Sequence, residues 1–135
     1  MLLSIIVPVR NEIDYIKPTF NSIIQSASEM NCEIIFVDGK STDGTFEWLK
    51  VETEKFKNCS LLINENKFVN FGFNLAFPKT TGKYIARLDG HTTYPKNYFK
   101  NAIKIFSAND QISIIGGPAI HEGLSWRGKT IANCM

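Results

Sequence analysis

The sequence predicts an α/β fold in which a mostly parallel sheet carries helices on both of its faces. Short apolar runs, typical of strands buried on both faces, alternate along the chain with segments whose apolar residues recur every three or four positions, as in amphipathic helices. This strand–helix–strand order favours right-handed crossovers and therefore parallel pairing. A chain of 135 residues has room for one such unit, so we expect a single domain over residues 1–135.

The first strand and helix are predicted from the opening of the chain. Residues 2–7 form an apolar run that Pro8 closes, which indicates a buried strand. Because proline is tolerated only in the first turn of a helix, Pro18 places the start of the next helix between residues 14 and 17. The apolar residues that define this helix are Ile16, Phe20, Ile23, Ile24 and Ala27.

A second strand and helix follow in the same order. Residues 33–37 are mostly apolar and end at Asp38, which predicts a strand. Residues 39–44 form a polar turn rich in helix-capping residues and lead into a helix predicted over residues 45–55. We expect the buried side of this helix to carry Phe46, Leu49 and Phe56.

The remainder of the chain predicts three further strands and two helices. The strands are expected over residues 60–63, 83–88 and 112–115, and one helix over residues 68–77. Pro95 suits the first turn of another helix. The apolar face of that helix would consist of Phe99, Ala102, Ile103 and Phe106. Residues 121–135 show no clear pattern.

Composition excludes several classes of protein. The 15 basic and 13 acidic residues nearly cancel, so the chain has no electrostatic footprint for nucleic acid or a membrane surface. Cys32, Cys59 and Cys134 are odd in number and scattered, which is typical of reduced thiols. No apolar stretch approaches the roughly 20 residues that cross a bilayer. The apolar opening lacks the basic segment that begins a signal peptide, so we do not interpret it as one. We therefore expect a soluble, cytoplasmic chain with no transmembrane segment and no nucleic-acid partner.

Polar residues gather where three of the predicted strands end. These clusters are residues 8–12, residues 38–43 and residues 89–91. Since ligands of open α/β sheets bind beyond the carboxyl ends of the strands, we expect the three clusters to converge on one edge and form a site.

Each cluster also has a purely structural explanation. Asp43 suits a helix cap better than a ligand contact, Glu12 suits a helix N-terminus, and Asp89 with His91 suits a turn as well as a shared cation. Common nucleotide and hydrolase motifs are missing: there is no GxxxxGK phosphate loop, no GxGxxG after the first strand and no GxSxG elbow. A phosphate-binding site here must therefore use a metal ion in place of a glycine cradle.

Three segments, in order, resemble family 2 glycosyltransferases with the GT-A fold. Residues 4–12, SIIVPVRNE, resemble the opening of that family, and residues 36–45, FVDGKSTDGT, resemble its VDDGSTDGT stretch. Residues 72–76 and then 81–91, which end in LDGH, resemble the stretch that ends in the metal-binding DxD motif. The match runs from residue 4 to about residue 99 and implies a Rossmann-like GT-A domain that binds a nucleoside diphosphate sugar.

The resemblance implies a nucleoside-binding side. Asp38 matches the acid that pairs with the nucleotide base, a hydrogen bond that favours uracil, and Ser41 matches a polar residue of the same loop. Gly39 departs from the family by replacing the second Asp of the usual pair, which weakens the nucleoside assignment there. The segment that matches the lining of the nucleoside pocket supplies the further candidates Pro8, Val9, Arg10 and Glu12.

The resemblance also implies a cation-binding side. Asp89 matches the first acid of DxD, near the ribose and the metal, and His91 matches the second, which is a metal ligand. The DGH pattern resembles a subset of the family related to succinoglycan-type exopolysaccharide synthesis. Imidazole keeps a ligand but removes a negative charge, so we expect a divalent cation and favour Mn²⁺ over Mg²⁺. Arg87 either adds positive charge near this site or points to solvent.

Members of the resembled family supply their catalytic base well downstream of this motif. The only acidic residues after His91 are Asp110 and Glu122, and neither lies in a recognisable motif for a general base. We therefore expect a truncated, donor-binding fragment of an inverting transferase, inactive alone, with its general base beyond residue 135. The expected partners are a UDP-linked sugar and a saccharide or lipid-linked acceptor in polysaccharide biosynthesis. We expect the full-length protein at the cytoplasmic face of the membrane. This piece alone could associate with itself through apolar surface that the rest of the enzyme would cover.

Two other functions stay open. The first is a stand-alone nucleotide-sugar-binding module without catalysis. The second is a sugar nucleotidyltransferase, which ranks last because residues 8–12 lack the glycine-rich loop expected after the first strand of such an enzyme.

Overall fold

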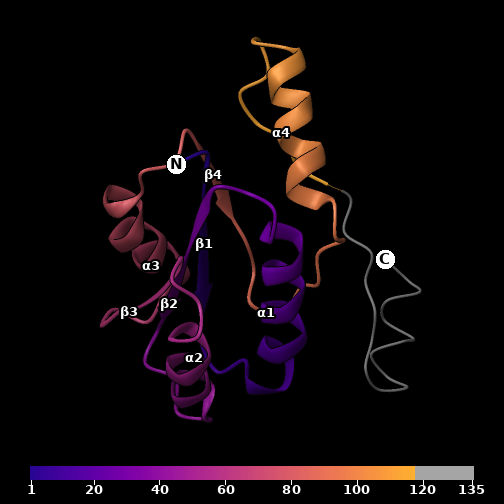
Figure 1. The fold of residues 1–135 in the computed structure, drawn as a ribbon. Coiled ribbons are helices and arrows are strands. Elements are labelled where there is room, and N and C mark those ends of the chain that lie inside the picture. The colour runs from indigo at the N-terminus through magenta and orange to yellow at the C-terminus, as the bar shows by residue number, and fades with distance from the viewer. Residues whose placement is uncertain (118–135) are drawn as a thin grey trace, which may run out of the picture. The chain divides into compact units, whose positions relative to one another are not determined.

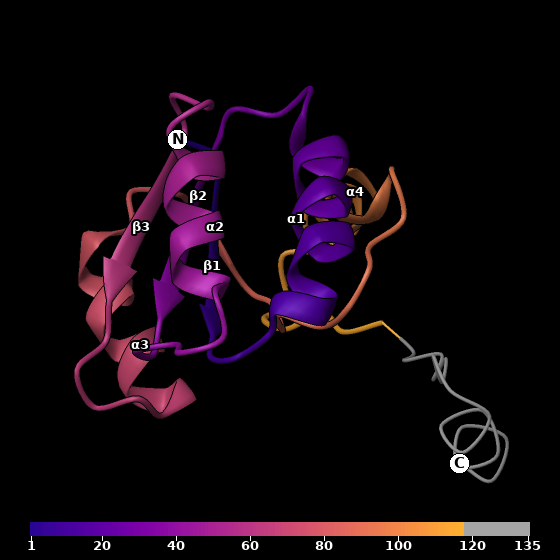
Figure 2. The same ribbon diagram turned by 90° about the horizontal axis from the view of Figure 1, so that it is seen from below.

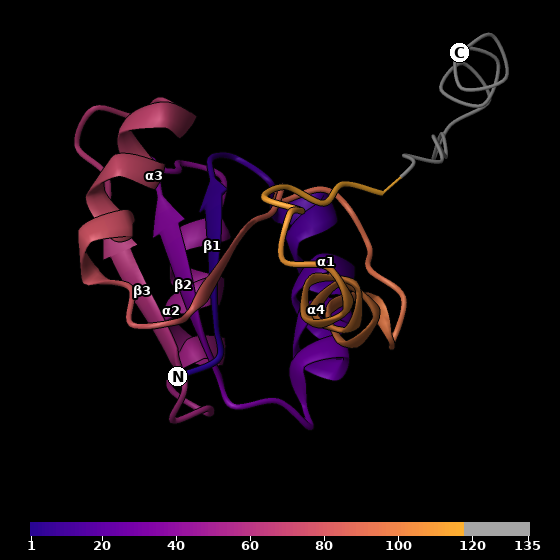
Figure 3. The same ribbon diagram turned by 90° about the horizontal axis from the view of Figure 1, so that it is seen from above.

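The computed structural model describes residues 1–117 and contains a parallel sheet with helices on both faces (Figure 1). The elements in chain order are β1 (Leu3–Val9), α1 (Ile13–Ala27), β2 (Cys32–Asp38), α2 (Thr45–Thr53), β3 (Cys59–Ile63), α3 (Val69–Ala76), the 3₁₀ turn η1 (Phe77–Lys79), β4 (Tyr84–Arg87) and α4 (Tyr98–Ala108). The described strands lie in the order β3-β2-β1-β4, and every pairing is parallel. Figure 3 shows β3, β2 and β1 side by side. The predicted fold class is confirmed.

The chain divides into two compact units, Met1–Asn101 and Ala102–Met135. The first unit contains the whole sheet, and the described part of the second contains the rest of α4 and residues 109–117. The single domain expected over residues 1–135 stays a prediction. The tail predicted without pattern, with Cys134 and Glu122, lies outside the described residues.

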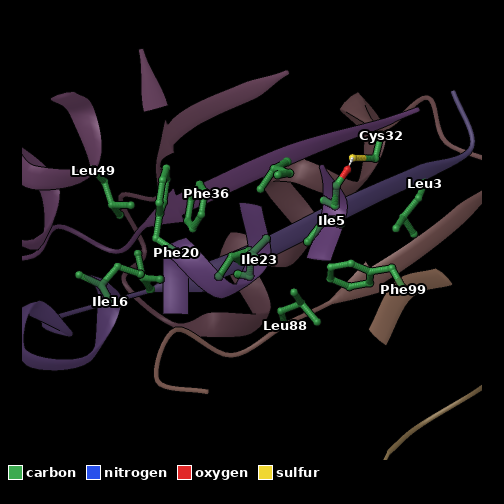
Figure 4. Close-up of a cluster of buried hydrophobic side chains, with 14 residues drawn as sticks. Leu3, Ile5, Ile16, Phe20, Ile23, Cys32, Phe36, Leu49, Leu88 and Phe99 are labelled. Atoms are coloured by element: carbon green, nitrogen blue, oxygen red, sulfur yellow. Dashed lines mark hydrogen bonds between the residues drawn. The ribbon is translucent and has the colours of Figure 1, made fainter. Parts of the chain in front are cut away.

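Helices α1 and α2 cover one face of the sheet and α3 covers the other (Figures 1 and 2). β1 is buried at every position because it has strands on both sides and helices on both faces. Phe20 anchors the larger core, since its ring stacks on Phe36 of β2 with centroids 5.2 Å apart (Figure 4). It also meets Trp48 of α2 edge-on at 5.4 Å. The smaller core, on the α3 side, is formed by Ile6, Ile35, Val37 and Ala76, with Phe73 and Leu62 packed against them.

Pro8 does not close the first strand, as the sequence predicted, but lies inside it opposite Val37. The pairing with β4 nevertheless ends at Ile6, whose carbonyl accepts from the Leu88 N–H at 2.9 Å. Alternate residues of a parallel strand face the same neighbour, so the next donor on this side would be the N–H that proline lacks. Pro8 therefore releases the chain after β4 without ending β1.

The first helix starts earlier than its proline predicts. α1 begins at Ile13, which places Pro18 in the second turn. The start is fixed from outside the helix, since the N–H groups of Glu12 and Ile13 donate to Thr45 Oγ1 at 2.9 Å and to Asp43 Oδ2 at 3.0 Å. A rule based on one segment could not include these contacts.

Two predictions in the second half are wrong. Pro95 precedes α4 instead of lying in its first turn; its carbonyl accepts from the Tyr98 N–H at 2.9 Å, which forms a turn before the helix. The strand expected over residues 112–115 is absent from the described residues. Ile114 is 88% exposed there, so its apolar side chain has no sheet to pack against.

The expected helix faces are confirmed in part. Leu49 and Phe99 are buried in the larger core, and Phe56 packs against it while remaining half-buried. Phe46 is only half-buried, and Thr45 and Thr53 take the buried positions on α2 instead. Among the described residues, no helix is long and apolar enough to cross a bilayer.

Candidate functional site

The loops that follow β1 and β2 are bound directly to each other. The Asn11 N–H donates to Ser41 Oγ at 2.9 Å, and the Thr42 N–H donates back to Asn11 Oδ1 at 2.8 Å. The Gly39 N–H donates to the Val9 carbonyl at 2.8 Å. These reciprocal bonds form because parallel strands deliver both loops to the same edge of the sheet.

Asp38, the last residue of β2, holds the second loop closed. Its side chain is buried, with Oδ1 accepting from the Ser41 N–H at 2.9 Å and Oδ2 from Ser41 Oγ at 2.5 Å. The structure therefore places Asp38 and Ser41 together, as the sequence predicted, and gives them a loop-closing function. Pairing of Asp38 with a nucleotide base stays a prediction.

Asp43 caps two helices at once. Its Oδ1 accepts from the Thr45 N–H at 3.0 Å and from Thr45 Oγ1 at 2.6 Å, while Oδ2 accepts from the Ile13 N–H at the start of α1. Burial alone would raise the pKa of Asp43, but these hydrogen bonds outweigh it and the pKa lies below its ordinary value. The N-cap residues themselves are Glu12 and Gly44, so Asp43 is not the cap residue that the sequence predicted, but its carboxylate binds the first N–H of both helices.

Gly39 permits a close approach of the segment that follows β3. A Cβ atom at Gly39 would lie 2.6 Å from the carbonyl oxygen of Lys67 and 3.3 Å from Cβ of Arg10. Asn64, buried just beyond β3, fixes this segment by donating from Nδ2 to the Phe68 carbonyl at 2.9 Å. Gly39 thus replaces the family's second Asp at a position where a side chain would collide with backbone.

Three described residues other than glycine have positive φ, and all lie in these loops. They are Asn11 (φ 54°), Lys40 (φ 57°) and Lys67 (φ 66°). For a residue with a Cβ the left-handed conformation costs roughly 1–2 kcal/mol, so packing must hold it in place. An ion pair between Lys40 and Glu65 links two of the loops.

The loop that follows β4 joins the other two through Glu12 and His91. His91 Nδ1 lies 3.1 Å from Glu12 Oε1, at the N-cap of α1. Gly90 allows this approach, because a Cβ there would lie 2.7 Å from Cγ1 of the buried Val9 and 3.5 Å from Cγ of Glu12. The three predicted clusters therefore meet at one edge of the sheet.

Asp89 is held by a residue that the sequence did not point to. Its N–H donates to the hydroxyl of Tyr94 at 3.1 Å, and the Tyr94 N–H donates to Ser22 Oγ in α1 at 3.0 Å. Burial raises the pKa of the Tyr94 hydroxyl, which favours its neutral form. Arg87, whose orientation the sequence left open, pairs with Asp89 at 3.3 Å between Nη2 and Oδ1, and both side chains are more than half exposed.

The remaining candidates differ in exposure. Pro8 lies near Gly72 of α3, Val9 is buried against the β4 loop, and Arg10 is exposed. The described residues contain no group of three or more His, Cys, Asp and Glu side chains arranged to hold a metal ion. The predicted ligands Asp89 and His91 would thus supply two protein atoms to a cation, whose remaining ligands would have to come from elsewhere. A shallow hollow between α2 and β3, with Phe46, Lys50 and Leu61 among its lining, contains none of the predicted site residues.

Comparison of the sequence with known families gives one assignment that covers most of the chain. Residues 4–132 match the profile described as Glycosyl transferase family 2. The dolichyl N-acetyl-α-D-glucosaminyl phosphate 3-β-D-2,3-diacetamido-2,3-dideoxy-β-D-glucuronosyltransferase of Methanococcus voltae is 32% identical over 77% of this chain and 33% of its own length. The succinoglycan biosynthesis protein ExoA of Rhizobium meliloti is 26% identical over 82% of this chain and 34% of its own length. The chain spans about a third of the length of these relatives.

Solved structures share the fold. TarS of Staphylococcus aureus in complex with UDP superposes with a TM-score of 0.70 at 22% identity, covering 90% of this chain and 39% of its own. A mannosyltransferase of Pyrobaculum calidifontis in complex with GDP-Man and Mn²⁺ superposes with a TM-score of 0.70 at 24% identity, covering 78% of this chain and 32% of its own. These likenesses confirm the GT-A type of α/β fold expected from the sequence.

Proposed function

The chain belongs to glycosyl transferase family 2, and from this premise we propose that it forms the nucleotide-sugar-binding part of an inverting glycosyltransferase. The observation that carries the proposal is the meeting of the loops after β1, β2 and β4, linked by the Asn11–Ser41 and Glu12–His91 contacts. A donor sugar nucleotide would bind at this edge, beyond the carboxyl ends of the strands.

On the nucleoside side we propose Pro8, Val9, Arg10, Asp38 and Ser41, with Glu12 at the junction between this side and His91. This choice is supported by the hydrogen bonds that join the loops after β1 and β2 at the same edge of the sheet. UDP is the first choice of nucleotide because an acidic acceptor such as Asp38 suits the N–H of uracil. The UDP complex of TarS is in line with this choice, whereas the GDP-Man complex of the Pyrobaculum enzyme makes GDP the alternative to test.

On the diphosphate side we propose Asp89 and His91 as holders of a divalent cation. Both side chains are exposed, and they offer a carboxylate oxygen and an imidazole nitrogen two residues apart. This donor set fits a cation whose other ligands are diphosphate oxygens, and the imidazole favours Mn²⁺ over Mg²⁺. When bound, such a cation would neutralise charge that grows on the leaving diphosphate. Arg87 adds positive charge beside Asp89.

We propose that the acceptor side and the general base come from sequence beyond this chain. Between His91 and residue 117, Asp110 is the only carboxylate side chain, and it is exposed in the second unit. The chain covers only about a third of the length of its relatives. For the whole protein we propose transfer to a saccharide or lipid-linked acceptor in polysaccharide assembly. We also propose that it acts in the cytoplasm. The short coverage of the relatives also favours a second candidate function, a non-catalytic nucleotide-sugar-binding module.

Isothermal titration calorimetry with UDP, GDP and UDP-sugars, each with and without Mn²⁺, tests the proposal. We expect Mn²⁺-dependent binding of a uridine nucleotide that Asp38→Ala weakens. Asp89→Ala and His91→Ala should remove the dependence on Mn²⁺. Uridine binding that survives Asp38→Ala would refute the base assignment, and metal dependence that survives both other variants would refute the cation site. Robust sugar transfer by this chain alone would refute the proposal that the general base lies outside it.

A further inference from the structure

We propose that Glu12 is a positioning residue that fixes the tautomer of His91 and so leaves its Nε2 lone pair for the cation. This inference rests on the proposed cation site. It differs from the nucleoside contact that the sequence suggested for Glu12. It predicts that Glu12 acts on the cation through His91 without touching cation or nucleotide.

The geometry couples the two side chains. Glu12 Oε1 lies 3.1 Å from His91 Nδ1, within hydrogen-bonding range. The Glu12 side chain is 21% exposed and that of His91 is 58% exposed, so a shielded carboxylate meets an accessible imidazole. The imidazole ring therefore contacts Glu12 while it remains open to a further ligand.

Glu12 is itself held by the loop that follows β2. Its N–H donates to Thr45 Oγ1 at 2.9 Å, and Thr45 Oγ1 donates to Asp43 Oδ1 at 2.6 Å. Its carbonyl accepts from the N–H groups of Tyr15 and Ile16 at 2.9 and 2.7 Å. The side chain makes no capping bond to α1 although it lies at the N-cap, so the carboxylate is free to bind His91.

The chemistry follows from the two ring nitrogens. A neutral imidazole carries one N–H, and an ionised carboxylate can only accept. Glu12 therefore keeps the proton on Nδ1, which leaves Nε2 as the only nitrogen with a lone pair. Metal-binding histidines commonly donate their other N–H to a carboxylate, which fixes the ring and raises its basicity; loss of such a partner typically costs about 10–100-fold in metal affinity.

The sequence between the two ligands supports the same arrangement. Gly90 brings the β4 loop so close to β1 that a Cβ would lie 2.7 Å from Val9 Cγ1. The residue between Asp89 and His91 thus has no room for a side chain while His91 is within reach of Glu12.

The first test measures the tautomer without any cation. Nitrogen and carbon chemical shifts of the two histidines, His91 and His121, are recorded at a pH of about 8, where an ordinary imidazole is neutral. We expect His91 as the Nδ1–H tautomer in the wild type and in Glu12→Gln, which keeps an acceptor oxygen. Glu12→Ala should shift His91 towards the Nε2–H form. An unchanged His91 tautomer in Glu12→Ala would overturn the proposal.

The second test measures Mn²⁺ affinity in the presence of UDP by electron paramagnetic resonance of the free ion. We expect Glu12→Ala to weaken Mn²⁺ about 10–100-fold, Glu12→Gln to weaken it less, and the exposed control Glu29→Ala to leave it unchanged. In a His91→Ala background Glu12→Ala should have no further effect. A full effect there would mean that Glu12 contacts the ligand directly and would overturn positioning. A tautomer shift in Glu12→Ala, combined with a wild type that does not bind Mn²⁺, would refute the cation site while supporting the contact between Glu12 and His91.

Discussion

At the scale of single residues, two glycines determine how closely the loops of the site approach one another. Gly90 packs on Val9 and Gly39 packs on the carbonyl of Lys67, and a Cβ at either position would lie within 2.7 Å of its neighbour. Both neighbours resist movement, since Val9 is buried and the Lys67 contact is with backbone. The glycines therefore belong to the site although neither contributes a chemical group.

Gly39→Asp restores the pair of acids usual in the family and tests this conclusion. We expect it to destabilise the chain by about 1–3 kcal/mol, as overpacking does, and to weaken UDP binding. Urea unfolding and calorimetry measure the two effects. The matched control is Gly116→Asp, where an added side chain meets open space. Tighter UDP binding by Gly39→Asp would show that the missing acid matters more than the packing.

Tyr94→Phe tests how Asp89 is held. The substitution removes the hydroxyl that accepts from the Asp89 N–H and leaves the ring contacts with Tyr98 and Phe99. We expect a loss of about 1 kcal/mol of stability and weaker Mn²⁺-dependent UDP binding. The exposed Tyr15→Phe is the control for removal of a hydroxyl. Unchanged binding in Tyr94→Phe would separate the Tyr94 contact from the site.

The sequence identified the chemical groups of the site but not the residues that hold them. The positions of Asp38, Asp89 and His91 at this edge were predictable because each lies at or just after the end of a predicted strand. Tyr94 and Thr45 were not, because a tyrosine in a loop and a threonine at a helix start have ordinary local explanations. Their contacts join segments far apart in the chain, and no local pattern encodes such a pairing.

At the scale of elements, order and type were predictable up to α4, but the last predicted strand and several boundaries were not. Parallel pairing of β1 and β2 followed from apolar runs and an intervening amphipathic helix. The start of α1 did not, because Asp43 and Thr45 fix it from another loop. The apolar run at residues 112–115 resembles a strand locally, yet a strand requires a partner, which sequence periodicity cannot supply.

Asp43→Ala tests whether one carboxylate fixes two helix starts. Loss of a single cap costs about 0.5–2 kcal/mol, and Asp43 accepts from N–H groups at the starts of both α1 and α2. We expect a loss towards or beyond the upper end of that range in urea unfolding. Asp43→Asn, which keeps one acceptor oxygen, should lose less, and the exposed Asp110→Ala should lose almost nothing. Equal losses in Asp43→Ala and Asp110→Ala would contradict the double cap.

At the scale of the first unit as a whole, Glu33 links strands at the end of the sheet opposite the candidate site, where the strands begin. Its Oε1 accepts from Ser4 Oγ of β1 at 2.6 Å, and from the N–H and Oγ1 of Thr81, before β4, at 2.7 and 2.9 Å. A single carboxylate of β2 thus ties together the starts of three neighbouring strands. Burial alone would raise the pKa of Glu33, but these hydrogen bonds to the ionised form outweigh it and the pKa lies below its ordinary value.

This depressed pKa determines how the stability of the unit depends on pH. A glutamate whose folded pKa is lower than its unfolded value, about 4.3, stabilises the fold fully above that value and loses the contribution as pH falls through the folded pKa. We therefore expect the free energy of unfolding of the wild type to fall more steeply between about pH 5 and pH 3 than that of Glu33→Gln, because the variant has no proton to gain there. Urea unfolding monitored by circular dichroism at several pH values measures both slopes, and the exposed Glu29→Gln should follow the wild type. Parallel curves for the wild type and Glu33→Gln would show that Ser4 and Thr81 bind a neutral side chain equally well, so that the carboxylate charge is not what holds the strand starts together.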